Sequence, residues 1–231
     1  QLRFPEPRLD REQTAAIRAL AATSEALSCG AIAASGGGGH GHGDEASPSV
    51  SELGADDAER FADQWQAAQA AAAALATTDA AAAAGYVQAS PQAPGVGTHW
   101  IDWRLIDAPF DPAHPSMLLF DERPGRPARL AGFSYWTRSE GSPPEGFAGD
   151  ADVWHSHLGL CFIDGWLFRE DVPAADGCTG EWLDGTDLWM LHAWVVEGLE
   201  NPAGPFAGRI EALCPGDREQ IADALRCEPP G

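Results

Sequence analysis

The chain has 231 residues, is 44% hydrophobic and carries nine tryptophans and nine phenylalanines, which is enough apolar material for one sizeable core. Its 35 acidic and 14 basic side chains give a formal net charge of -21 at pH 7. Binding to nucleic acid or to anionic membranes is not expected, because both need clustered Lys and Arg. No run of residues approaches the roughly 18 apolar positions of a membrane span, so none is expected.

Residues 1–50 form the first predicted unit, a helix followed by a glycine-rich loop. Capping residues and apolar spacing predict the helix over residues 10–29. Residues 35–45 are rich in glycine, which loses too much backbone entropy on ordering to hold regular structure, and we expect a flexible loop. His40 and His42 in this loop could bind Cu or Zn transiently, but a glycine linker that happens to carry two histidines is the favoured interpretation.

Residues 51–231 form the second predicted unit, which begins with an alanine-rich helix over residues 56–84. Residues 77–79 are expected to break this helix into a long and a short piece, and Gly85 is expected to end the second piece. An apolar stripe at helical spacing favours a helix that covers a sheet. This stripe consists of Phe61, Trp65, Ala68, Ala72 and Leu75.

After Gly85, short β-type runs alternate with turn clusters, as expected for antiparallel strands. The pattern predicts a fold of the α+β class, in which N-terminal helices pack on an antiparallel sheet or a partly closed β-barrel. A short capped helix is predicted at residues 217–226. The predicted strands span residues 98–105, 117–121, 129–137, 153–163, 166–169 and 188–196.

Five cysteines indicate disulfide bonding. Cys161 and Cys178 flank a predicted hairpin and are the best pair. Cys214 and Cys227 flank the predicted C-terminal helix, whose ends would lie roughly 15 Å apart. Because the Cα atoms of a disulfide lie within about 7 Å of each other, these two cysteines are not expected to pair. Cys29 with one of these two is the weaker second pair. Together with a chain that starts without Met, the cysteines favour a secreted, extracellular protein.

The segment from Asp152 to Phe162 combines two histidines, a cysteine and four large apolar residues, and we predict that it lies in one strand. Side chains alternate between the two faces of a strand. One face would carry Trp154, Leu158, Leu160 and Phe162, and the other would carry His155, His157, Gly159 and Cys161.

The histidines of this segment predict a metal site. His155 and His157 project the same way from the strand, so both imidazoles can reach one ion. His192, at mid-strand on an otherwise apolar face, is the predicted third ligand. His99 is the candidate fourth ligand, or a residue that orients a ligand. The predicted centre is mononuclear and holds Cu or Zn, since neutral imidazoles suit both metals.

The same residues also have a purely structural interpretation. A histidine beside tryptophan is often a half-buried residue with a backbone hydrogen bond, and this alternative stays open, most strongly for His99. Cys161 could act as a soft copper ligand, but a disulfide to Cys178 is favoured. Met190 is expected to pack in the core.

Other catalytic interpretations are weaker. Ser156 would point away from both neighbouring histidines, so a Ser-His nucleophile has the wrong geometry. Asp150 and Asp152 precede the histidines closely and could orient an imidazole or act as a base. A solvated loop is the expected setting of the acidic residues Glu181, Asp184 and Asp187, which match no EF-hand spacing.

The sequence therefore predicts a secreted metal-binding protein, and it leaves open whether the protein is an enzyme. An ion with an open position would permit hydrolysis, hydration or redox chemistry, whereas a closed site would store, carry or be stabilised by metal. The alternative is a secreted binding module without metal, in which a pocket lined by Trp and His holds a carbohydrate or another small ligand.

Several of these segments together resemble a group of uncharacterised secreted proteins of high-GC bacteria. The resemblance rests on WHSHLGLC from Trp154 and WMLHAWVV from Trp189, with GTHW from Gly97 before them and NPAG from Asn201 after them. It covers roughly residues 84–214. It implies that the helical and β regions form one domain and that the histidine segments belong together, and it implies no particular activity.

Overall fold

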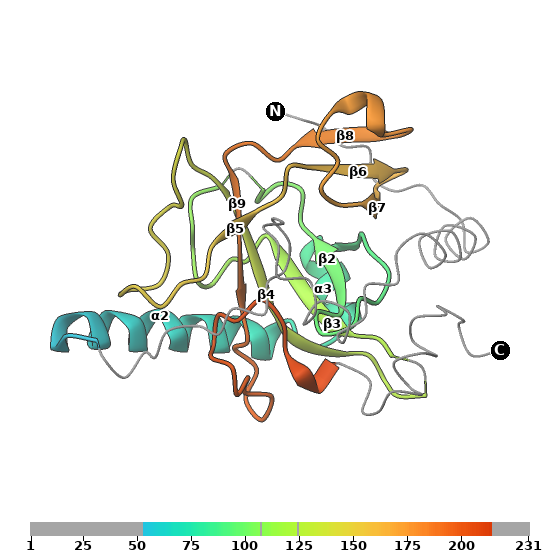
Figure 1. Cartoon of the computed structure of the whole chain (residues 1–231). Helices are drawn as coiled ribbons and strands as arrows, with labels where there is room; N and C mark the ends of the chain where they lie inside the picture. Colours follow the sequence, from blue (N-terminus) through green and yellow to red (C-terminus); the bar gives the residue numbers. More distant parts are fainter. Residues whose placement is uncertain (1–52, 107, 124, 214–231) are drawn as a thin grey trace.

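The computed structural model describes residues 53–106, 108–123 and 125–213. These residues form two α-helices, two short 3-10 helices and nine strands in two antiparallel sheets (Figure 1). The predicted α+β class is confirmed, and neither sheet closes into a barrel. None of the helices in this part of the chain is both long enough and apolar enough to cross a bilayer.

The larger sheet, called sheet A here, has six strands in the order β1-β2-β3-β4-β9-β5. Every neighbouring pair is antiparallel. The predicted strand at residues 117–121 is confirmed, and those at 98–105, 129–137 and 188–196 are found with shifted ends. The strands are β1 (Val87–Gln88), β2 (Thr98–Ile101), β3 (Met117–Asp121), β4 (Arg129–Arg138), β5 (His155–Ser156) and β9 (Leu188–Ala193).

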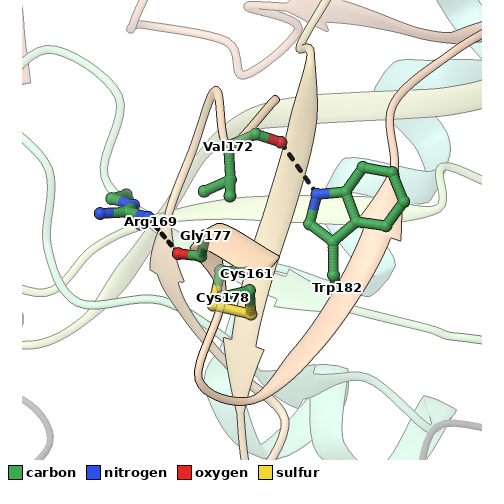
Figure 2. The surroundings of a disulfide bond; sticks show 6 residues. All are labelled: Cys161, Arg169, Val172, Gly177, Cys178 and Trp182. Carbon is green, nitrogen blue, oxygen red and sulfur yellow. Dashed lines mark hydrogen bonds between the residues drawn. A yellow bond between two sulfur atoms is a disulfide. The ribbon is translucent and has the colours of Figure 1, made fainter. Parts of the chain in front are cut away.

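The smaller sheet, called sheet C, has the order β7-β6-β8. A disulfide joins Cys161 to Cys178 with their Cα atoms 5.4 Å apart, which confirms the predicted pair (Figure 2). In the same view the Trp182 indole donates a hydrogen bond to the Val172 carbonyl at 2.8 Å. The elements are β6 (Gly159–Ile163), β7 (Trp166–Arg169), the 3-10 helix η3 (Ala175–Gly177) and β8 (Glu181–Asp184).

The two helices, α2 (Ala55–Ala74) and α3 (Thr78–Ala84), reproduce the predicted break. Thr77 caps α3, because its side-chain oxygen accepts the Ala80 N–H at 3.2 Å. Gly85 ends α3 with a φ of 104°, a left-handed conformation that glycine adopts without strain. The predicted stripe of α2 faces inward: Ala68 and Ala72 are buried, and Phe61, Trp65 and Leu75 pack against the core.

The two faces of sheet A contact different hydrophobic clusters. One face belongs to the cluster that also contains the buried alanines of α2. On the other face, Met117 and Met190 pack with Leu160 and Phe162 of sheet C. Further along the same face lies a third cluster that includes Leu119, Trp194, Ile210 and Leu213, the last of these in the 3-10 helix η4 (Glu211–Leu213).

Two predictions about strands were wrong. Residues 153–163 do not form one strand, because β5 pairs with β9 in sheet A while β6 pairs with β7 and β8 in sheet C. Leu158 lies at this crossing and is 48% exposed instead of facing the core. The acidic residues Glu181 and Asp184 lie in β8, not in a loop, since Leu183 between them is buried and pairs with Leu160.

Several predictions lie outside the described residues. They concern the helix at 10–29, the glycine-rich loop with His40 and His42, the helix at 217–226, and Cys29, Cys214 and Cys227.

Candidate functional site

The four histidines predicted as metal ligands lie together in the structure. Their ring centroids are 5.5 Å apart for His155 and His157, 5.3 Å for His155 and His192, and 6.3 Å for His99 and His192. Three of the rings are buried, and His155 is half-buried. We call these four residues the histidine cluster.

Strand register explains why His155 and His192 meet. His155 is paired with Met190 across β5 and β9, and His192 is the next residue of β9 on the same face. Diagonal neighbours of this kind are close enough for long side chains to touch. We call this face of sheet A the histidine face.

His99 reaches the same place from β2. His99 is paired with Leu119 of β3, which is paired with Gly132 of β4. Two residues after Gly132 on the same face, Ser134 is paired with His192 of β9. Two strands separate β2 from β9, so their backbones would lie about 14 Å apart in a flat sheet. The two rings, at 6.3 Å, therefore converge over the intervening strands.

A backbone contact fixes the tautomer of His192, and a hydroxyl contact positions the His99 ring. His192 Nδ1 lies 2.8 Å from the Gly208 carbonyl, which can only accept, so Nδ1 carries the proton. The Ser90 hydroxyl lies 3.0 Å from His99 Nδ1 and accepts the His99 backbone N–H at 2.8 Å, and these contacts hold the His99 ring in place. In its neutral form, His192 carries its lone pair on Nε2.

His157 has an acidic neighbour. Its Nδ1 lies 3.4 Å from Asp171 Oδ1. Burial disfavours the charged form of His157, but the carboxylates of Glu170 and Asp171 outweigh burial and raise its pKa. A carboxylate beside an imidazole N–H is the usual arrangement that orients a metal-ligating histidine.

Two residues at the site were missed by the sequence interpretation. The Ser134 side chain is fully buried on the histidine face, and its Oγ has no hydrogen-bond partner within the described part of the chain. An unpaired buried hydroxyl costs about 1–3 kcal/mol. The Trp194 ring lies over Gly132, where any side chain would collide with it, and 6.0 Å from the His192 ring. A serine in the middle of a strand, between two aromatic residues, was the available signal for Ser134.

Other predicted residues lie elsewhere. Cys161 is held in the disulfide and is not a free thiolate. Met190 packs in the core, as predicted. Asp150 is exposed, and Asp152 lies close to Phe147 and Trp154, which belong to the cluster on the opposite face of the sheet. In residues 53–106, 108–123 and 125–213, no three His, Cys, Asp or Glu side chains are arranged as they stand to hold a metal ion.

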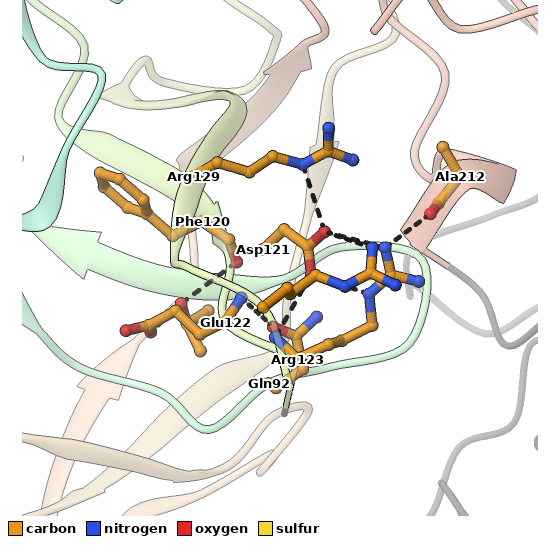
Figure 3. A network of polar contacts seen from close by, with 9 residues as sticks. Gln92, Phe120, Asp121, Glu122, Arg123, Arg129 and Ala212 are labelled. Atoms are coloured by element: carbon orange, nitrogen blue, oxygen red, sulfur yellow. Dashed lines mark hydrogen bonds and ion pairs between the residues drawn. The ribbon is translucent and has the colours of Figure 1, made fainter.

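Sheet A contains a second buried polar site at the end of β3. Asp121 is fully buried, and Arg123 Nε and Nη2 lie 2.7 and 2.8 Å from its two oxygens (Figure 3). Arg129 and Arg126 approach the same carboxylate at 3.4 and 3.6 Å. Burial alone would raise the pKa of Asp121, but hydrogen bonds from Arg123 and the charges of Arg123 and Arg126 outweigh it and lower the pKa.

Comparisons with protein-family models, with curated proteins and with solved structures found no match to this chain.

Proposed function

We propose that this is a metal-binding protein in which His155, His157 and His192 hold one Cu or Zn ion and His99 is the fourth ligand or its neighbour. The observation that carries the proposal is the spacing of the rings. Two imidazoles that bind one ion at 2.0–2.1 Å have ring centroids roughly 5 Å apart. The centroids of His155 lie 5.5 Å from His157 and 5.3 Å from His192.

Binding would require the side chains to move, because no three of the described His, Cys, Asp or Glu side chains are arranged as they stand to hold an ion. The two ring pairs that include His155 are near the required separation. The proposal therefore includes a change of rotamer that brings the imidazole nitrogens to one point. The Nδ1–H of His192, held by the Gly208 carbonyl, supports this proposal, because it leaves Nε2 as the ligating nitrogen of the neutral ring.

The number of histidine ligands decides the chemistry. With three ligands the ion keeps an open position for water or substrate, as in catalytic sites, whereas a fourth ligand from His99 closes the site. An open site would support Lewis-acid or redox chemistry. The net charge of -21 supports cation binding in either case, because an acidic surface raises the local concentration of cations.

Export to an oxidising compartment is part of the proposal. The disulfide between Cys161 and Cys178 is the observation that supports it, since such bonds persist mainly outside the reducing cytosol. A secreted protein would meet Cu and Zn as free or weakly complexed ions.

Elemental analysis tests the proposal. The untagged full-length chain is treated with Cu²⁺ or Zn²⁺, dialysed and analysed, next to the double variant His155→Ala, His157→Ala. We expect about one ion per chain in the unchanged protein and nearly none in the variant. Near-ultraviolet circular dichroism of the tryptophans checks that the variant is folded.

Two control variants complete the design. His114→Ala removes an exposed histidine that pairs with Asp111 away from the cluster. His40→Ala, His42→Ala removes the other His-x-His sequence. Both controls should keep the ion. Equal metal content in the unchanged protein and in the His155, His157 variant, or none in either, would refute the proposal.

The metal-free alternative, a glycan-binding module, has less support. Carbohydrate stacking needs an accessible aromatic face, whereas three of the nine tryptophans are buried and the other six are half-buried. Indifference of the thermal unfolding temperature to chelator, together with saturable quenching of tryptophan fluorescence by glycans, would favour the alternative.

A further inference from the structure

The Ser134 hydroxyl is a buried polar group on the histidine face that the described protein surroundings do not explain. Its Oγ is buried, and no hydrogen bond to it is found within the described residues. Buried hydroxyl groups in folded proteins nearly always have a partner, and an orphan calls for a ligand, a water molecule or an ion. Alanine would fit this place without an unmet hydrogen bond.

The register shows from which side a partner can come. In the row of paired residues that crosses the sheet, Ser134 lies between Met117 of β3 and His192 of β9. Met117 belongs to an apolar cluster and Ile101 follows it in the row, so that side offers no strong acceptor. The histidine cluster occupies the other side.

We propose that the Ser134 hydroxyl donates a hydrogen bond to an oxygen ligand, either water or a small oxyanion such as a carboxylate, that is bound at the histidine cluster. This inference rests on the proposed metal centre and specifies its open position. The metal would hold one lone pair of the ligand oxygen and Ser134 would donate to another. His155, the half-buried member of the cluster, marks the side from which the ligand enters.

Cobalt provides a spectroscopic test. Co²⁺ is bound to the full-length protein in place of the native ion, and acetate is titrated while the visible absorption of Co²⁺ is followed. Ser134→Ala should weaken acetate binding roughly 10- to 100-fold, the usual range for one lost hydrogen bond to a charged ligand. It should change Co²⁺ affinity less than about twofold, since Ser134 is not a metal ligand.

Two further variants separate this role from a structural one. Ser134→Thr keeps the hydroxyl and should retain most of the acetate affinity. Thr137→Val removes a buried hydroxyl from the opposite face of the same strand and should leave acetate affinity unchanged. The metal-free Ser134→Ala protein should unfold at the same temperature as the unchanged protein or higher, because no protein hydrogen bond is lost.

The outcomes of these experiments distinguish the role inferred for Ser134 from the proposed metal site on which it rests. If Co²⁺ binds and acetate affinity is equal in the unchanged protein and in Ser134→Ala, the inference is refuted and the metal site stands. If Co²⁺ does not bind to the unchanged protein at all, both are refuted. A large fall in the unfolding temperature of metal-free Ser134→Ala would show that the hydroxyl serves the fold, and would also refute the inference.

Discussion

Sheet A contains two buried polar sites, and they differ in how completely the protein itself satisfies them. At the end of β3 both oxygens of Asp121 contact arginine nitrogens, and Arg123 also donates to the Ala212 carbonyl at 2.9 Å (Figure 3). On the histidine face, Ser134 has no such partner among the described residues. A fully matched site is explained by folding alone, whereas the unmatched hydroxyl is the observation from which a bound ligand is proposed.

The largest expected effect is on the free energy of unfolding and concerns Asp121, whose carboxylate is paired with arginines. Asp121→Asn leaves Arg123 without its buried carboxylate, and we expect the free energy of unfolding to fall by about 3 kcal/mol. Metal content should not change. Urea unfolding at pH 7, with Asp176→Asn as an exposed control of equal charge change, measures the loss. An Asp121→Asn protein as stable as the unchanged one would show that this site is not structural.

The same carboxylate gives a pH dependence whose sign follows from its lowered pKa. In the unfolded chain the group titrates near its usual value of about 4, and in the folded protein it stays charged to lower pH. Its stabilisation is therefore present at neutral pH and lost as the pH falls below about 4. Asp121→Asn should show a shallower acid limb in the same unfolding series.

An intermediate effect, on metal affinity, is expected at Asp171, the acidic neighbour of the histidine cluster. Asp171→Asn removes the carboxylate beside His157 Nδ1, and metal affinity should fall about 10- to 100-fold because the imidazole is less basic and less well oriented. Asn tolerates the positive φ of 54° at this position, so the backbone is not strained. Competition with a chromophoric chelator measures the affinity. Unchanged affinity would place Asp171 outside the metal centre.

The smallest effect is expected at Asp152, a half-buried acid with no cationic neighbour among the described residues. Burial raises its pKa to about 7, and the nearby polar groups of Phe147 and Trp154 lower it only in part. Between about pH 4 and pH 7 the unfolded chain is ionised while the folded protein still binds the proton. Stability therefore falls as the pH rises through this window.

Removing the titration of Asp152 tests this reasoning. Asp152→Asn should gain on the order of 1 kcal/mol in free energy of unfolding at pH 7 and nothing at pH 3.5, with partial burial already discounted. Chemical unfolding at the two pH values is the measurement. A gain of equal size at both would mean that packing, and not ionisation, is responsible.

Local signals in the sequence were enough for the helices and for much of sheet A. The start of α3 follows from the capping residue Thr77 and its end from Gly85, because both act on the backbone next to them. The disulfide was also predictable, because the hairpin between Cys161 and Cys178 is short. The gathering of the histidines could be predicted because each lies in a strand-like aromatic segment and two of them share a His-x-His spacing.

The rest depended on long-range register, which alternation does not reveal. Residues 153–163 alternate in the same way whether the chain stays in one sheet or changes sheet at Leu158. Ser134 lies in a predicted strand, but only the pairing with His192 places it at the site. The exposed acidic side chains of β8 concealed a strand whose single buried residue, Leu183, faces sheet C.

The wide separation of the clustered histidines along the chain has a consequence for the order of folding. The histidine cluster takes His99 from an early strand and His192 from the last one, and His155 pairs only once β9 is in place. Closing such long loops is slow compared with forming hairpins. The histidine cluster therefore forms only when β2, β5 and β9 have all joined sheet A. An ion bound there, as proposed, would stabilise only molecules in which this sheet is complete, and its retention would report that sheet A has assembled.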